Sequence, residues 1–486
     1  MFDRPRRRRR SKSKPDPLSR PEANPNAPPA QPWIAISVEE LIEGAAGPKP
    51  AVEPPRPKPA PPPPASYSRI AVLPAALLVG AAAVFVIQSS VRSTLAEAWV
   101  GESSLVSLQR AVAVVPDHSL AWLRLGVRQS REGESGSAVA SLQNAVERAP
   151  GASSPRIALA LELERLGRFD EAESALLGAA EAEAGFSPRW SLANYYARRG
   201  NWDQVWPWTH ESILADPGRL AAAASLCWRA EADPATILDL AIPDEPRINR
   251  RYFAYLYDLG ELDAMRQAWP RFSTAATESE TALATQYVDR LLAAGYVDEA
   301  VDAWNFLCDR ALLPYAPLRG PDQRLLTNQF FLTDPSGRGF DWKAHDHRGV
   351  LWTRPTLQGN RGSIDFRFSG VQESGITLLT QVIPVVPGTY VLRFEFSTQG
   401  MEIRTGLGWV VRDLYSAADI HPFVTFNNAE GFWDVEDVTF VIPPGTRAAV
   451  LELRYLVVES QARRLAGFSL RDVRLALAEA TGASLR

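Results

Sequence analysis

The pattern of apolar and polar residues divides the chain into four stretches. Residues 70–91 form an uninterrupted apolar run. Over residues 92–313 apolar side chains recur at three- and four-residue spacings, which is typical of helices. Over residues 325–478 they alternate with polar ones, which predicts strands. Residues 1–69 show neither pattern. We therefore predict a multidomain chain with a disordered tail, one transmembrane helix, an all-α solenoid and an all-β sandwich.

The apolar run IAVLPAALLVGAAAVFVIQSSV predicts a membrane-spanning helix, because its 22 residues would make about 33 Å of helix, enough to cross a ~30 Å hydrocarbon core. A cleaved signal peptide is the alternative, with a cleavage site in LAEA at 95–98. The long segment that precedes the run favours an uncleaved anchor. Basic residues lie mainly before it, with Arg69 nearest and Arg92 almost alone after it. This asymmetry predicts a cytoplasmic N-terminus, with the bulk of the chain in the periplasm of a bacterium.

The tail carries 18 of the 39 prolines and too few apolar groups to fold. It holds one apolar island, residues 33–45, which is either a docking segment for a cytoplasmic partner or a nascent helix without one. The tail has 13 Lys+Arg against 7 Asp+Glu, whereas the rest of the chain has 39 against 49. An acidic body of this kind argues against nucleic-acid binding.

A repeat runs through the helical stretch. The steps from Pro116 to Pro150 and from Ala138 to Ala172 both span 34 residues, and a third unit closes at Pro217. The pattern resembles the tetratricopeptide (TPR) repeat. The residues that carry the resemblance are Trp122, Leu125, Gly126, Ala138, Leu142, Ala145 and Pro150, with Gly167 and Ala172 in the second unit and Tyr196 and Gly200 in the third.

The resemblance implies antiparallel helix pairs that stack into a solenoid with a concave surface for a protein partner. Residues 103–116 are expected to be the second helix of an earlier unit, whose first helix would continue from the membrane segment. Two degenerate units follow around Gly260 and Gly295, and the segment ADPATILDLAIPDEP between the units is expected to form a truncated pair.

The last stretch predicts a β-sandwich through six alternating segments: SIDFRFSG, ITLLTQVIPV, TYVLRFEFST, VEDVTFVIPP, AVLELRYLVV and SLRDVRLAL. Its hairpin-like and closing segments, with Asn328, Phe330 and Trp342 at its start, resemble jelly-roll carbohydrate-binding modules of the galactose-binding-like type. Two departures matter. Gln329 replaces the usual glycine, and Phe331 stands where those modules often place a glutamate that helps hold a structural Ca²⁺ with a residue equivalent to Asp472. The resemblance therefore leaves a structural Ca²⁺ in doubt, and no other cofactor is expected.

If the sandwich binds glycan, the ring platforms would come from four aromatic residues on or beside loops: Trp409, Tyr415, Phe432 and Trp433. The alternation of Val438, Phe440 and Ile442 predicts that Trp433 points away from the core, although core packing is the alternative for all four. The HDH motif at 345–347 suits either a metal site or a solvated loop, and the lack of nearby cysteines or clustered carboxylates favours the loop.

The remaining candidate chemistry is sparse. Cys227 and Cys308 lie in apolar helical contexts and are expected to be buried thiols, although the sequence does not decide whether they pair. His118 and His210 are interpreted as structural. No pair of carboxylates suited to glycoside hydrolysis stands out. We therefore expect a membrane-anchored scaffold for protein–protein interaction in envelope assembly, linked to polysaccharide export. Direct glycan binding by the sandwich is the alternative, and an enzyme is the least favoured reading.

Overall fold

The computed structural model of the protein describes residues 69–230, 233–319, 325–355, 361–401, 403–457 and 465–478. Side chains are described from residue 80 onward. The predicted tail up to residue 68, with its docking segment 33–45, lies outside these residues. The chain forms two compact units, residues 1–232 and 233–486.

The first helix, α2 (Arg69–Glu102), contains the whole apolar run over residues 70–91. Within the described residues, no helix combines the length and apolar character that a membrane crossing requires. The side chains of residues 69–79 lie outside that description. The membrane-spanning helix therefore stays a prediction.

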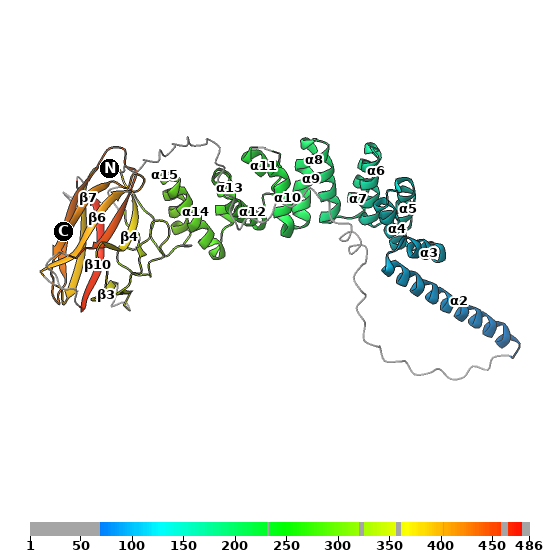
Figure 1. The fold of residues 1–486 in the computed structure, drawn as a ribbon, viewed down its shortest axis with the longest axis horizontal. Helices are drawn as coiled ribbons and strands as arrows, with labels where there is room; N and C mark the ends of the chain where they lie inside the picture. Colours follow the sequence, from blue (N-terminus) through cyan, green and yellow to red (C-terminus); the bar gives the residue numbers. More distant parts are fainter. Residues whose placement is uncertain are drawn as a thin grey trace, which may run out of the picture. The chain divides into compact units, whose positions relative to one another are not determined.

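The first unit continues as successive helices and one 3₁₀ turn (Figure 1). Their bounds are α3 (Leu105–Val114), α4 (Ser119–Arg131), α5 (Ser135–Arg148), α6 (Ser153–Arg165), α7 (Phe169–Ala182), α8 (Phe186–Arg198), α9 (Trp202–Ala215), η1 (Pro217–Arg219) and α10 (Leu220–Trp228). Helices α4–α5, α6–α7 and α8–α9 are the three predicted pairs. The end of α2 packs on α3 through Ala96 and Val100, which confirms the expected earlier pair.

Repeat positions occupy the interior of the pairs. Ala138, Leu142 and Ala145 on α5 are at most 1% exposed, and the equivalent residues on α7 and α9 are equally buried. Small residues at helix crossings let the backbones approach, and the larger ones fill the space between them. The turn inside each pair ends the first helix with a left-handed glycine, as at Gly167 (φ 75°) and Gly200 (φ 69°), a conformation that costs glycine little. The TPR-like architecture is thus confirmed for this unit.

The second unit begins with α11 (Pro234–Leu240), which has only seven residues and matches the truncated segment expected there. Two full pairs follow: α12 (Pro246–Leu259) with α13 (Leu262–Ala275), and, after η2 (Glu278–Glu280), α14 (Thr281–Ala293) with α15 (Val297–Asp309). Their turn glycines, Gly260 and Gly295, again have positive φ. The degenerate repeats are therefore helix pairs as predicted.

The sandwich follows α15 and its strands, among the described residues, form two antiparallel sheets. One sheet has the order β1 (Lys343–Ala344), β4 (Ile376–Pro384), β9 (Ala448–Tyr455), β6 (Arg404–Asp413) and β7 (Asp419–Asn427). The other has the order β2 (Val350–Thr353), β3 (Ile364–Ser369), β10 (Leu465–Leu477), β5 (Gly388–Gln399) and β8 (Asp434–Ile442). Strands distant in the sequence, such as β4 and β9, lie side by side in these sheets, and Figure 1 shows the sandwich at the end of the chain.

Aromatic side chains fill the space between the sheets. Tyr390, Leu392, Phe394 and Phe396 of β5 are all buried on one face, as their alternation predicts. All six predicted strands are present. Strands β6 and β7 lacked a sequence signal: β6 is buried on both faces from Thr405 to Val411 and so shows no alternation, whereas β7 contains polar residues and a proline. Trp342, one of the residues that carry the resemblance, lies in this core and is 0% exposed.

Candidate binding surfaces

The last helix pair, α14–α15, packs directly against the sandwich, and we call this contact the seam. Trp304 of α15 lies at its centre. Its indole ring is 0% exposed. The ring of Tyr315 stacks on it with centroids 5.8 Å apart, and Phe340 meets it edge-on at 5.9 Å. Gly339 lies so close that a Cβ there would be 2.5 Å from the indole ring. Trp304 of α15 therefore packs against the loops that lead into the sandwich.

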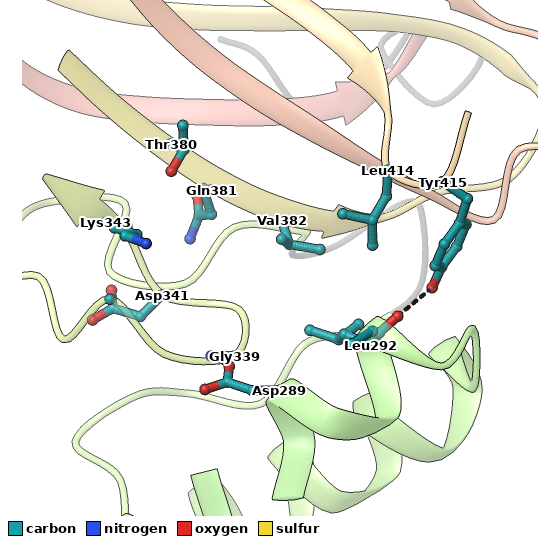
Figure 2. Close-up of a pocket in the computed structure, with 12 residues that line it drawn as sticks. Asp289, Leu292, Gly339, Asp341, Lys343, Thr380, Gln381, Val382, Leu414 and Tyr415 are labelled. Carbon is teal, nitrogen blue, oxygen red and sulfur yellow. Dashed lines mark hydrogen bonds between the residues drawn. The ribbon is translucent and has the colours of Figure 1, made fainter. Parts of the chain in front are cut away.

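Polar contacts reinforce the same seam. The Asp289 carboxylate on α14 accepts a hydrogen bond from Gly339 N at 2.7 Å and pairs with Arg338 at 3.0 Å. The Tyr415 hydroxyl donates to the Leu292 carbonyl at 2.9 Å, which Figure 2 draws as a dashed line. The bonds of Asp289 hold the loop 337–339 against α14. The bond of Tyr415 holds the loop after β6 against the end of the same helix.

A cavity of about 320 Å³ opens within this seam. Its two walls differ in chemistry (Figure 2). Leu292, Val382, Leu414 and the ring of Tyr415 line one side, and Thr380, Gln381, Asp341 and Lys343 line the other. An apolar wall facing a few convergent polar groups is the usual composition of a small-molecule site.

The side-chain amide of Gln381 is held in one orientation. Its Nε2 donates to the carbonyl oxygens of Thr327 at 2.8 Å and of Phe340 at 2.7 Å. The reverse orientation would place an amide oxygen against two carbonyl oxygens, so the assignment follows from the donors. Gln381 is 1% exposed, and no described residue donates to its Oε1.

Asp341 is also a buried side chain with one oxygen that accepts hydrogen bonds and one that does not. Its Oδ2 accepts from the Tyr315 hydroxyl and from Ser336 N, both at 2.7 Å. Its Oδ1 is buried and receives no hydrogen bond from the described residues. Burial raises the pKa of this carboxyl, and the hydrogen bonds from Ser336 and Tyr315 only partly oppose that rise. Both oxygens are closed off from solvent, although buried acceptors normally receive a hydrogen bond.

The four predicted ring platforms separate into different environments. Trp409 is 1% exposed and packs on Trp342 and Phe394 between the sheets, so its assignment as a platform is wrong: β6 is buried on both faces, and position 409 faces inward. Phe432 is 58% exposed. Trp433 is 38% exposed and points away from the core as its parity predicted, with the Arg471 guanidinium 3.8 Å above its ring. The structure leaves exposed rings at the consecutive positions Phe432 and Trp433 and places Tyr415 in the seam.

On the first unit, the first helices of successive pairs carry half-buried apolar side chains. Leu120, Leu161 and Trp190 occupy α4, α6 and α8 and pack on the edge of the core. In the repeat register they fall at positions that share one helix face. Trp122, by contrast, is fixed in place, because its Nε1 donates to the Pro116 carbonyl at 2.7 Å.

A polar network ties two of these first helices together. Glu162 on α6 is 3% exposed. It accepts from the Ser130 hydroxyl of α4 at 2.6 Å and pairs with Arg165 at 2.5 Å. Burial alone would raise the pKa of this carboxyl, but the hydrogen bonds from Arg165 and Ser130 outweigh it and lower the pKa below its usual range. Tyr196 on α8 likewise links two successive repeats, because its hydroxyl donates to Glu173 on α7 at 2.6 Å.

The remaining candidates have structural partners. His345 Nε2 lies 3.0 Å from Thr380 Oγ1, and His347 Nε2 lies 2.6 Å from the Thr377 carbonyl. Asp472 pairs with Arg474 at 2.6 Å, and Phe331 is fully buried against Trp342. Among the described side chains, no group of three or more His, Cys, Asp or Glu could hold a metal ion.

The two cysteines are free and buried, as predicted. Burial raises the pKa of both thiols to about 12. His118 caps the start of α4 by accepting from Ala121 N, in keeping with its structural interpretation.

Sequence reasoning missed Asp289, Asp341 and Gln381. They come from a helix, a loop and a strand far apart in the chain, and only the packing of α14 on the sandwich brings them together. No motif in the sequence marks such a seam.

No protein-family model matches this chain, and no curated protein matches it. Solved structures with similar folds include PilF of Pseudomonas aeruginosa, at 14% identity, covering 45% of this chain and 93% of that chain with a TM-score of 0.26. YrrB, a TPR protein with an unusual peptide-binding site, is 11% identical and covers 43% of this chain and 96% of that chain, with a TM-score of 0.22. TmCBM61 in complex with β-1,4-galactotriose is 17% identical and covers 32% of this chain and 99% of that chain, with a TM-score of 0.23. At these scores nothing about function follows from the likenesses.

Proposed function

We propose that the protein is a scaffold whose first unit holds a protein partner. This proposal rests on a difference in burial between the helices. Repeat residues on the second helices, such as Ala138 and Leu142, are fully buried in the packing of the pairs. Leu120, Leu161 and Trp190 remain half-buried along successive first helices. Rows of partly exposed apolar side chains on a rigid solenoid suit a protein surface better than a reaction.

The proposal includes a membrane anchor at residues 70–91. Four consecutive large residues, Val84 to Ile87, are 56% to 72% exposed. Consecutive positions point in different directions around a helix, so this part of α2 is apolar on every side. A helix of that kind needs either a protein core or a lipid environment around it. The neighbouring Arg69 supports an orientation with the tail in the cytoplasm and the rest of the chain outside it.

The proposal also includes a cellular location. A single-pass protein of the bacterial inner membrane with a periplasmic solenoid would hold its partner close to the membrane, as envelope assembly and polysaccharide export require. A reporter that is active only outside the cytoplasm tests this topology. We expect activity when it follows Arg486 and none when it precedes Met1, and the reverse pattern would overturn the orientation.

The partner surface is tested by affinity purification of the full-length protein from solubilised membranes. Leu161→Ala and Trp190→Ala should each reduce the co-purifying partner, because both truncate side chains on the proposed surface. Leu177→Ala is the matched control, since Leu177 on the second helix α7 is also partly exposed, at 36%. Equal recovery with all three variants would place the partner elsewhere.

Glycan capture by the sandwich is the second candidate. Phe432 and Trp433 favour it, because adjacent exposed rings can cover the C–H face of a sugar. If this function is correct, Trp433→Ala should abolish retention on a polysaccharide column without a large change in melting temperature. Retention that survives the substitution would exclude these rings as the platform.

A further inference from the structure

A groove of about 480 Å³ lies between α15 and the turns at one end of the sandwich. Its described lining shares no residue with that of the cavity in the seam. We propose that residues 479–486, which follow β10 and lie outside the described residues, bind in this groove and cover its apolar floor. This contact belongs to the second unit and is independent of the scaffold function.

Apolar side chains form most of the groove. Val297 and Val301 come from α15, and Val385, Val386 and Pro387 come from the turn between β4 and β5. Val297 and Val385 are buried, whereas Val386 is 46% exposed and Pro387 is exposed beside it. A groove of this kind favours an apolar side chain that enters it and displaces water.

The described chain ends beside this groove. Leu477 of β10 pairs with Tyr390 of β5, and Tyr390 is part of the lining. Leu477 also lies so close to Gly388 that a Cβ there would be 2.7 Å from Leu477 Cδ1. Gly388 directly follows Pro387, which lines the groove. The residues after Ala478 therefore begin at the edge of the groove.

The length and composition of the segment suit the groove. Its sequence EATGASLR has eight residues, which span about 26 Å when they are extended. Leu485 is its only large apolar residue, and it is flanked by small residues and by Arg486. The leucine side chain would occupy the apolar floor. The segment also carries one charge of each sign, on Glu479 and on Arg486.

The rim of the groove has matching charges. Asp298 of α15 forms an ion pair with Arg447 from the turn between β8 and β9. Asp302 lies one turn further along α15, is exposed, and has no ion pair with a described residue. Arg319, on the same rim, is also exposed and without an ion pair among the described residues. One carboxylate and one guanidinium are thus left for the two charges of the segment.

Disulfide trapping in the full-length protein tests the contact. Cys227 and Cys308 are buried, so they should not interfere when the reduced protein is oxidised mildly. Val301→Cys combined with Leu485→Cys should form an intramolecular disulfide, identified by peptide mass mapping. Thr439→Cys combined with Leu485→Cys is the matched control, because Thr439 is exposed on β8, two strands from β10 but outside the groove. The groove pair should form roughly tenfold faster or more, because binding raises the effective concentration of the two thiols.

Charge reversal tests the ion pair in the same cysteine background. Asp302→Arg should slow formation of the disulfide, because it places two positive charges together. Arg486→Glu should slow it as well. The two reversals combined should restore the parent rate, since they recreate the pair with its signs exchanged. A merely structural effect of either substitution would not be rescued by the other.

Equal rates for the groove pair and the control pair would overturn the proposal. A disulfide that joins two copies of the chain, at a rate that depends on protein concentration, would make a second copy the occupant and would also overturn it. So would a doubly reversed variant as slow as the single ones. Melting curves show that each variant is folded, and Pro387→Cys with Leu485→Cys replaces the groove pair if Val301→Cys is unstable.

Discussion

Gly126 on α4 lies directly against Leu142 on α5, so closely that a Cβ at position 126 would be 2.6 Å from Leu142 Cγ and 3.1 Å from the Ala138 carbonyl oxygen. Leu142 is 1% exposed. The small residue expected at this position of the repeat is therefore required by contact with the partner helix.

Gly126→Ala should destabilise the first unit by about 1–3 kcal/mol through overpacking, despite the better helix propensity of alanine. Gly136→Ala is the matched control, because Gly136 is also helical but a Cβ there meets nothing within 4 Å. That change should stabilise by roughly 0.5–1 kcal/mol. The two melting temperatures should shift in opposite directions, and a gain for both would mean that the pair α4–α5 is packed more loosely than described.

The Glu162 network should make the first unit sensitive to acid. The hydrogen bonds from Arg165 and Ser130 hold the folded pKa of Glu162 below its unfolded value, so its contribution to stability is complete above the unfolded pKa and is lost as the pH falls through the lowered folded pKa. Glu162→Gln should cost about 1 kcal/mol near neutral pH, a modest figure because Arg165 is half-exposed to solvent. Thermal melts between neutral and acidic pH should show a smaller acid-induced loss in the variant. An identical loss in both proteins would place the sensitivity in other carboxylates.

Neither cysteine should react with a thiol reagent in the folded protein. With the pKa of each thiol raised to about 12, the thiolate fraction at neutral pH is very small. Both side chains are also buried. Maleimide labelling followed by mass spectrometry should find Cys227 and Cys308 unmodified until denaturant is added. Rapid labelling of either thiol without denaturant would contradict the burial.

Trp409 and Trp433 of the sandwich should respond differently to truncation. Trp409→Ala should cost about 3–5 kcal/mol, because its ring is fully buried between the sheets. Trp433→Ala should cost much less, since its ring is 38% exposed and meets the Arg471 guanidinium. Denaturant melts of the full-length variants measure both values. A similar loss for the two would mean that Trp433 belongs to the core.

Periodicity predicted the elements whose two faces differ. Alternation identified β5, where Phe394 faces inward and Arg393 outward, and the repeat identified the helix pairs around Ala138 and Ala172. It did not detect β6, whose residues are buried on both faces. For the same reason Trp409 was predicted as a surface ring: a strand without alternation does not tell which side chains point inward.

The candidate cavity could not be predicted, because its chemistry depends on orientation. Gln381 is one glutamine among several in the sequence. The orientation of its side-chain amide is fixed because Nε2 donates to two carbonyl groups from other loops. The exposure of Trp433 could be predicted, since strand parity extends one residue beyond β8. Properties that depend on the local periodicity of apolar residues can be predicted from the sequence. Properties that depend on long-range packing cannot.

The indole of Trp304 also determines where the chain can be cut. A fragment that starts at the change of periodicity near residue 320 would keep Phe340 but lose Trp304, against which Phe340 packs. It would also lose Leu292, whose carbonyl binds Tyr415. The isolated sandwich would then expose an apolar patch to water and be prone to aggregate. A fragment that starts at Asp233, where the second compact unit begins, keeps that surface covered. The shortest fragment that contains the sandwich and stays soluble should therefore include the helices that precede it.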